Sequence, residues 1–244
     1  MRWTVTPLLE GTSYSSSCTL LASGAARVIV DTGLLLQEGQ LRAAIAARGL
    51  APDDIDVVIN THLHLDHCGN NSLFPRAIIV LSRAEWTWTD AFYQALFTSR
   101  TPEQVAARFY PEIGAHALQT RTIRNVARLA RLFWRRERLG DEARFRWAEE
   151  ADLPPGLELL PTPGHTPHHL SVRVDAADPV IVAGDAVLTE DPAVKVRTMI
   201  PHSQVQFAAT RQRLLDLGVR IIPGHGRGFQ PAAAGRLEPS GRAS

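Results

Sequence analysis

The sequence predicts an α/β protein in which polar side chains gather at one edge of a sheet. Three observations lead to this prediction. Short apolar runs rich in Val and Ile, such as residues 55–60, are typical of buried strands. Stretches of helical composition separate several of these runs. Histidine or aspartate follows four of the runs, and strand ends are where α/β proteins build their sites.

The expected elements can be placed in chain order. Strands are expected at residues 2–9, 18–22, 27–33, 55–60, 77–81, 157–160, 170–174, 180–183 and 221–223. The first two are expected as edge strands, because a Ser- and Gly-rich turn joins them. Helices are expected at residues 38–48, which Gly49 ends, and at residues 204–217.

The densest polar cluster comes directly after residues 55–60, where the chain must turn. It contains His62, His64, Asp66 and His67. His62 and His64 alternate by two, so in extended backbone they point to the same side. Asp66 and His67 then have to diverge, which suits two adjacent metal ions better than one. Imidazole and carboxylate groups together suit zinc, iron or manganese.

Three further candidate ligands lie far along the chain, at His165, Asp185 and His225. Each follows an apolar run, and each has a glycine immediately before it. Glycine lets the backbone turn tightly, so the side chain after it can sit just past a strand end. We therefore expect these three side chains to meet the first cluster at one sheet edge.

The ordered set of His62-x-His64-x-Asp66-His67, His165, Asp185 and His225 resembles the metallo-β-lactamase-fold hydrolase superfamily, from Val28 to about Gly228. The resemblance implies a four-layer αβ/βα sandwich with the site at one edge of two facing sheets. It assigns one metal to His62, His64 and His165, and the other to Asp66, His67 and His225. Asp185 would bridge the two. The resemblance also makes Asp31, Thr32 and His169 candidates to support the metal loops.

Residues 83–147 are expected to form a helical insertion, which begins with a capping box from Ser82 to Glu85. One helical face of the insertion carries a stripe of arginines: Arg121, Arg124, Arg128, Arg131 and Arg135. The stripe is either a solvated face or a contact for an anionic substrate, nucleic acid or membrane surface. The insertion also holds aromatics that form either core or a substrate pocket: Trp86, Trp88, Phe92, Tyr93 and Phe97.

Composition sets broader limits on the protein. The 244 residues are 45% hydrophobic and 21% charged, which predicts one globular domain over residues 1–230 and a loose tail over 231–244. A net charge of +1 implies no general attraction to polyanions. Two cysteines are too few for a disulfide framework, and Cys68 is expected to be a small buried thiol. With no apolar run long enough to span a membrane and no signal peptide, the cytoplasm is the expected location. The sequence leaves the oligomeric state open.

The ligand set predicts a hydrolase with two Zn²⁺ ions, with iron or manganese as alternatives, and a bridging hydroxide that attacks the substrate. Asp66 is the candidate to pass a proton to the leaving group. Residues 60–81 look most like the N-acyl-homoserine lactonases, although Leu188 stands where those enzymes usually carry tyrosine. A small ester or lactone is the expected substrate. A nuclease, a mononuclear-iron dioxygenase and a non-enzymatic metal-binding protein remain alternatives.

Overall fold

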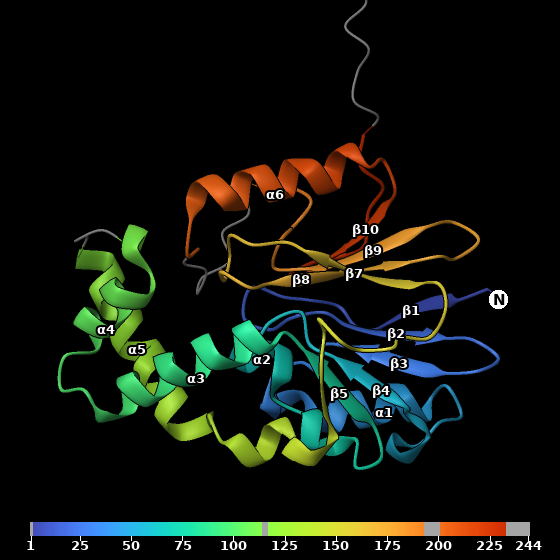
Figure 1. Ribbon diagram of the computed structural model, residues 1–244, viewed down its shortest axis with the longest axis horizontal. Coiled ribbons are helices and arrows are strands. Elements are labelled where there is room, and N and C mark those ends of the chain that lie inside the picture. Colours follow the sequence, from blue (N-terminus) through green and yellow to red (C-terminus); the bar gives the residue numbers. More distant parts are fainter. Residues whose placement is uncertain (1, 114–116, 193–200, 233–244) are drawn as a thin grey trace, which may run out of the picture.

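Two β-sheets face each other at the centre of the protein in the computed structural model, which describes residues 2–113, 117–192 and 201–232 (Figure 1). Helices cover the outer faces, with α6 (Gln204–Asp216) over one sheet and α1 (Glu38–Ala46) over the other. The four-layer αβ/βα arrangement expected from the sequence is therefore confirmed. The tail expected at 231–244 falls outside the described residues from residue 233 onward.

The larger sheet has six strands in the order β1-β2-β3-β4-β5-β6. Antiparallel pairing joins β1, β2 and β3, and parallel pairing joins β3, β4, β5 and β6. The strand bounds are β1 Thr4–Leu9, β2 Cys18–Ala22, β3 Arg27–Val30, β4 Val57–Ile59, β5 Ile78–Leu81 and β6 Phe145–Trp147. Because β2 pairs on both sides, the expectation that residues 18–22 form an edge strand is wrong.

The smaller sheet has four strands in the order β10-β9-β8-β7. Only β9 and β10 are parallel to each other. The bounds are β7 Leu157–Pro161, β8 Leu170–Val174, β9 Val180–Gly184 and β10 Arg220–Pro223. The parallel pairs in both sheets direct their carboxyl ends to one edge of the sandwich.

The core explains why several strand sequences are apolar at every position. Val28 and Val30 of β3 face the second sheet, whereas Ile29 between them packs in the cluster that includes Leu41 and Ile45 of α1. A strand buried on both faces needs a continuous apolar run instead of an alternating one. The valine-rich strands were recognisable from the sequence for this reason.

Residues after β5 leave the sandwich as a helical extension, at the left of Figure 1. Its α-helices are α3 Arg83–Thr98, α4 Pro102–Phe109 and α5 Ala117–Phe133. The chain returns through two 3-10 turns into β6, so the last three residues of the expected helical insertion form a strand. Within the extension Tyr93 stacks on Trp134 with ring centroids 4.0 Å apart, which gives these helices an aromatic core of their own.

The remaining helices are short. They are α2 Leu65–Cys68 and the 3-10 segments η1 Leu35–Gln37, η2 Pro52–Asp54, η3 Asn71–Leu73, η4 Pro111–Ile113, η5 Arg136–Leu139 and η6 Glu142–Arg144. Among the described residues, none of the helices has both the length and the apolar character needed to cross a bilayer.

Candidate metal centre

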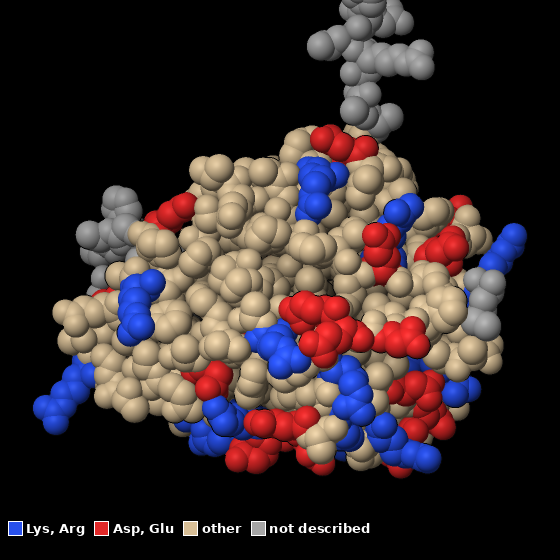
Figure 2. Space-filling model, in the orientation of Figure 1, with Lys and Arg blue, Asp and Glu red and all other residues tan. Residues whose placement is uncertain are grey.

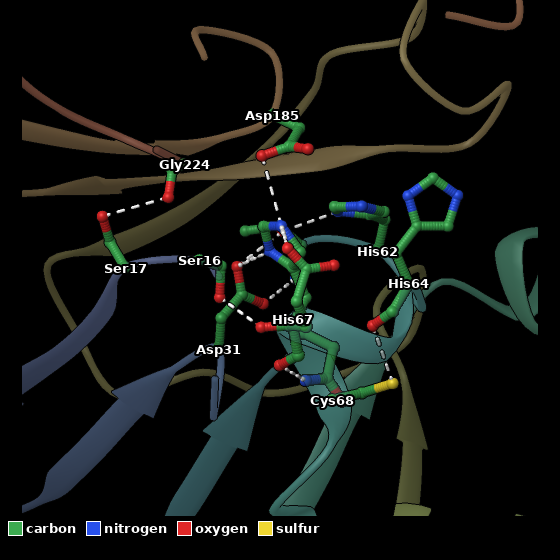
Figure 3. Close-up of polar contacts among 12 residues, drawn as sticks. Ser16, Ser17, Asp31, His62, His64, His67, Cys68, Asp185 and Gly224 are labelled. Atoms are coloured by element: carbon green, nitrogen blue, oxygen red, sulfur yellow. Dashed lines mark hydrogen bonds and ion pairs between the residues drawn. The ribbon is translucent and has the colours of Figure 1, made fainter. Parts of the chain in front are cut away.

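The candidate ligands lie just past strand ends of both sheets, in loops and in the short helix α2. His62, His64 and His67 lie between β4 and the end of α2, His165 follows β7, and Asp185 and His225 follow β9 and β10. Figure 3 shows Asp185 reaching from the loop after β9 towards the imidazoles that the opposite sheet presents. Residues more than 160 positions apart therefore meet at one edge of the sandwich.

Two glycines allow this close approach of the loops. Gly184 has a positive φ of 52°, and a Cβ atom there would lie 2.6 Å from Thr61 Oγ1. A Cβ atom on Gly224 would lie 2.0 Å from Asp185 Oδ1. A larger residue at Gly184 would push the two sheets apart at Thr61, and one at Gly224 would push Asp185 away from the loop after β10 of the same sheet.

The candidate ligand atoms fall into groups whose members lie within 4.8 Å of one another. The groups are His62, His64 and His165; Asp66, His67 and His225; and His62, His67 and Asp185. Asp185 lies at the centre, because its Oδ2 is 3.2 Å from His165 Nε2 while its Oδ1 is 3.2 Å from His67 Nε2 and 3.3 Å from His225 Nε2. The structure thus brings together all seven residues that the sequence singled out.

Four of the five histidines contact a group outside the cluster through one ring nitrogen and direct the other into it, whereas His165 Nδ1 is buried without a partner among the described residues. His67 Nδ1 donates to Asp31 Oδ2 at 2.7 Å, and His225 Nδ1 donates to the Thr12 carbonyl oxygen at 2.7 Å. Among the described residues, buried His62 Nε2, His67 Nε2 and Asp185 Oδ1 have no partner with hydrogen-bond geometry. Orphaned nitrogens and oxygens that face one another are what a bound cation would satisfy.

The loops are also held by residues that the resemblance suggested as supports. Asp31 adopts a positive φ of 55°, and besides His67 its carboxylate accepts hydrogen bonds from the Thr61 amide and hydroxyl, both at 2.8 Å. His169 contacts the Thr162 hydroxyl at 2.8 Å through Nδ1 and accepts from the Asp185 amide at 3.1 Å through Nε2. The Thr32 hydroxyl donates to Asn71 at 2.8 Å beneath the same loop.

Electrostatics divide the histidines into two kinds. Burial lowers the pKa of His62 and His165 well below the usual value, and it lowers the pKa of His64 to about 4. These three imidazoles are neutral at pH 7 and can offer a lone pair to a cation. Burial alone would also lower the pKa of His225, but the neighbouring Asp185 carboxylate raises it to about 9. A cation bound beside Asp185 would take the place of that proton.

Two contacts at the centre were not predicted from the sequence. The Tyr110 hydroxyl lies 2.8 Å from His64 Nε2, which leaves His64 Nδ1, 2.9 Å from His165 Nε2, to face the centre. Glu85 is 1% exposed and accepts a hydrogen bond from the Thr166 hydroxyl at 2.8 Å. Burial raises the pKa of Glu85 to about 7. No sequence signal marks Tyr110, and the signal at Glu85 resembled a helix cap.

Beside the centre lies a cavity of about 290 Å³ between the sandwich and the helical extension. His64 and Asp66 border it at one end, and thirteen other residues, all aliphatic or aromatic, form the rest of its lining. The aromatic residues include Phe92 and Tyr93 of α3, which are 6% and 2% exposed. Phe92 and Tyr93 therefore belong both to the core of the extension and to the wall of a pocket.

Several arginines of the predicted stripe are bound within the protein itself. Arg124 pairs with Glu103 of α4. Arg131 donates to the carbonyl oxygens of Leu96 and Ser99 at 3.1 and 3.0 Å, where α3 ends. The Arg121 side chain falls outside the described residues. Arg124 and Arg131 thus fasten α5 to α4 and α3.

Cys68 is 1% exposed, and burial raises the pKa of its thiol well above the usual value. Its Sγ donates to the His64 carbonyl oxygen at 3.1 Å. The expectation of a small buried thiol is confirmed.

Several known proteins are similar to this chain in sequence. Metallo-beta-lactamase domain-containing protein 1 of Homo sapiens is 30% identical over 217 residues, covering 83% of this chain and 59% of that protein. The chain spans about three-fifths of the length of the mouse and human relatives. An N-acyl homoserine lactonase of a Bacillus species is 24% identical over 199 residues, covering 71% of this chain and 64% of that protein.

The fold of a metallo-beta-lactamase-like protein from Thermotoga maritima matches with a TM-score of 0.60, over 95% of this chain and 100% of that one. Because the sequence identity is 20%, this match shows a common fold alone. The model of the metallo-beta-lactamase superfamily matches residues 11–226 and so includes every loop that carries a candidate ligand. The chain belongs to the metallo-beta-lactamase superfamily.

Proposed function

We propose that the chain is a hydrolase with two Zn²⁺ ions, acting on a small uncharged ester or lactone. The position of Asp185 carries this proposal, because its two oxygens face histidines of different groups at 3.2 and 3.3 Å. In this proposal Asp185 bridges two cation sites. One site comprises His62, His64 and His165, and the other comprises Asp66, His67 and His225.

The residues fit two divalent cations in number and chemistry. Five imidazole nitrogens and two carboxylates converge, and the outer nitrogen of His67 is fixed by Asp31, as in many zinc sites. Two divalent cations held there would lower the pKa of water towards neutrality and polarise a carbonyl oxygen.

The chain's own groups supply the remaining functions. Asp66 borders both the centre and the cavity, and its Oδ2 lies 3.6 Å from His225 Nε2. From this position Asp66 can carry a proton to the departing oxygen. The cavity can bind the apolar part of a substrate and exclude water around the reacting bond. An apolar lining favours an uncharged substrate over a phosphodiester.

A nuclease of the same superfamily was the strongest alternative, and the surface gives it little support. Arg124 and Arg131 are engaged by acceptors of the protein itself. On the face shown in Figure 2, basic and acidic side chains are interspersed. Phosphate binding depends instead on several free cationic groups that can release counterions.

The proposal is tested with protein purified without chelator. Elemental analysis should give two metal ions per chain, mainly zinc, and the protein should hydrolyse neutral aryl esters or lactones. Arg100 and Arg128 are exposed, so the double variant Arg100→Glu with Arg128→Glu reverses free charge and leaves the contacts of Arg124 and Arg131 in place. Ester turnover should survive this change. One iron per chain would support the dioxygenase alternative, and cleavage of single-stranded RNA that the double variant loses would support the nuclease.

A further inference from the structure

Glu85 is a buried carboxylate for which the proposed reaction has no use. It lies in the first turn of α3 and is 1% exposed. Its Oε1 accepts from the Leu63 amide at 3.4 Å and from the Thr89 hydroxyl at 3.2 Å, and its Oε2 accepts from the Thr166 hydroxyl at 2.8 Å. The backbone of His168 provides a further hydrogen bond. Burying a carboxylate is costly, and here donors from three segments offset the cost.

Apart from Thr89, which belongs to α3 itself, the donors come from the two loops that carry one candidate cation site. Leu63 stands between His62 and His64, after β4 of the larger sheet, and Thr166 follows His165, after β7 of the smaller sheet. One carboxylate therefore ties the facing sheets together directly beside the point where His64 Nδ1 and His165 Nε2 lie 2.9 Å apart.

Capping of α3 does not account for the Glu85 side chain. Ser82 accepts from the Glu85 amide at 3.3 Å, but the Ser82 hydroxyl donates to Glu149 Oε1 at 2.8 Å. The Arg83 amide also donates to the Glu149 carboxylate, at 3.2 Å. Ser82 and Glu149 thus share the capping at the start of the helix, and the Glu85 carboxylate is directed at the ligand loops instead.

The second candidate site is held by a different segment. The Ser16 hydroxyl donates to the Asp66 carbonyl oxygen, and the Ser17 hydroxyl donates to the Pro223 carbonyl oxygen at 2.7 Å, two residues before His225. Figure 3 shows Ser16 and Ser17 on the side of the centre away from His64. Each candidate site therefore has a support that the other does not share, in addition to Asp31, which holds both His67 and Thr61.

From this arrangement we infer that Glu85 is a positioning residue that selectively supports the cation site of His62, His64 and His165, acting through Leu63 and Thr166. This inference rests on the proposed function, because it requires cations to bind at the centre. Fixing the loops that present the ligands lowers the cost of ordering them on binding, and loss of such supports typically lowers metal affinity by about 10–100-fold.

The test is a Co²⁺ titration of the full chain, followed by visible absorption and by competition with a chelator. Glu85→Gln should lower the affinity for one of the two Co²⁺ equivalents at least tenfold and leave the affinity for the other unchanged. Thr166→Val should have the same effect. In the combined variant, the loss of Co²⁺-binding free energy should be smaller than the sum of the two single losses, because both substitutions break the same hydrogen bond between Glu85 and Thr166. Ser17→Ala should weaken the opposite equivalent. Glu149→Gln is the matched control, since it removes a carboxylate from the same helix end without touching the loops.

The outcomes separate the two proposals. Two equivalents bound to Glu85→Gln with the affinities of the unmodified protein would overturn the role of Glu85 and leave the hydrolase proposal standing. Equal weakening of both equivalents would overturn the selectivity. If the unmodified chain binds no Co²⁺, the proposed function is overturned, and the role of Glu85 is overturned with it because that role requires bound cations. Should Glu85→Gln fail to fold, Thr166→Val carries the same test with a smaller change.

Discussion

Replacing Gly224 with alanine should displace the Asp185 carboxylate from the centre. A Cβ atom at this position would lie 2.0 Å from Asp185 Oδ1, and real Cβ contacts essentially never fall below 3.0 Å. The two atoms must therefore move apart by at least the 1.0 Å difference between these distances. Gly224 cannot absorb the movement easily, because the backbone of Gly184 lies 3.0 Å from the same Cβ position.

The expected magnitude follows from packing. Forcing extra atoms into a close-packed region costs about 1–3 kcal/mol of unfolding free energy. For a chain of this length, each kcal/mol corresponds to about 2–4 °C in melting temperature, so Gly224→Ala should melt about 2–12 °C lower. The same shift moves Asp185 relative to His67 and His225, from which its Oδ1 is 3.2 and 3.3 Å distant. Metal affinity should fall by about tenfold or more.

Gly226 offers a matched control in the same loop. A Cβ atom there meets nothing closer than 3.7 Å, so Gly226→Ala should change little. Differential scanning fluorimetry with and without a chelator measures the stability difference, and Zn²⁺ competition with a fluorescent chelator measures affinity. If Gly224→Ala matched Gly226→Ala in both measurements, the contact between Gly224 and Asp185 would not constrain the centre as argued.

Four further outcomes are expected. Asp185→Asn keeps the side-chain shape but removes the charge that offsets two cations, so metal content and hydrolysis should fall while circular dichroism stays unchanged; full content would argue against bridging. Tyr110→Phe should reduce kcat more than Tyr93→Phe, because only Tyr110 contacts His64, at 2.8 Å; equal effects in steady-state assays would contradict this. Phe92→Ala should raise KM with metals retained, and an unchanged KM would argue against substrate binding in the cavity. Zn²⁺ uptake at pH 7.5 should release protons, because the pKa of His225 is raised to about 9 in the metal-free protein; calorimetry in buffers of different ionisation enthalpy measures the release.

It could be predicted from the sequence that the seven candidate ligands lie close together, because each of them follows the end of a recognisable strand. A strand that is apolar at every position is buried on both faces, and parallel neighbours end at one edge. Gly164, Gly184 and Gly224 each precede a candidate ligand and have little space for a side chain, since a Cβ atom would lie 2.0–2.6 Å from its nearest neighbour. Composition and spacing along the chain were enough to place these side chains together.

The capping-box prediction shows where local patterns fail. Ser82 does accept from the Glu85 amide, as the box requires. The Glu85 side chain does not return to Ser82, because Thr166 and Leu63 offer it donors in the interior. Thr166 lies 81 residues away in sequence, and nothing local to residues 82–85 indicates that the loop after β7 will pack there.

The cavity could not be predicted for a related reason. Its walls combine Leu35 of η1, Leu65 of α2, Phe92 of α3 and Ile123 of α5, four segments that share no sequence pattern. Aromatic residues at near-helical spacing are expected equally in a core between helices and in the wall of a pocket. Phe92 and Tyr93 belong to the core of the extension and also line the cavity. Only the packing of the extension against the sandwich decides which of their faces borders the centre.

Helix α3 connects these two unpredicted features. Its first turn presents Glu85 to the ligand loops, and its middle presents Phe92 and Tyr93 to the cavity. Glu85 lies two turns before Phe92, so substitutions in the middle of α3 can reshape the cavity while the first turn still holds the loops. We therefore expect variants at Phe92 to change which ester or lactone is preferred without loss of cation binding, whereas variants at Glu85 should change cation binding for every substrate alike. A Phe92 variant that lost cations together with activity would contradict this separation of roles along one helix.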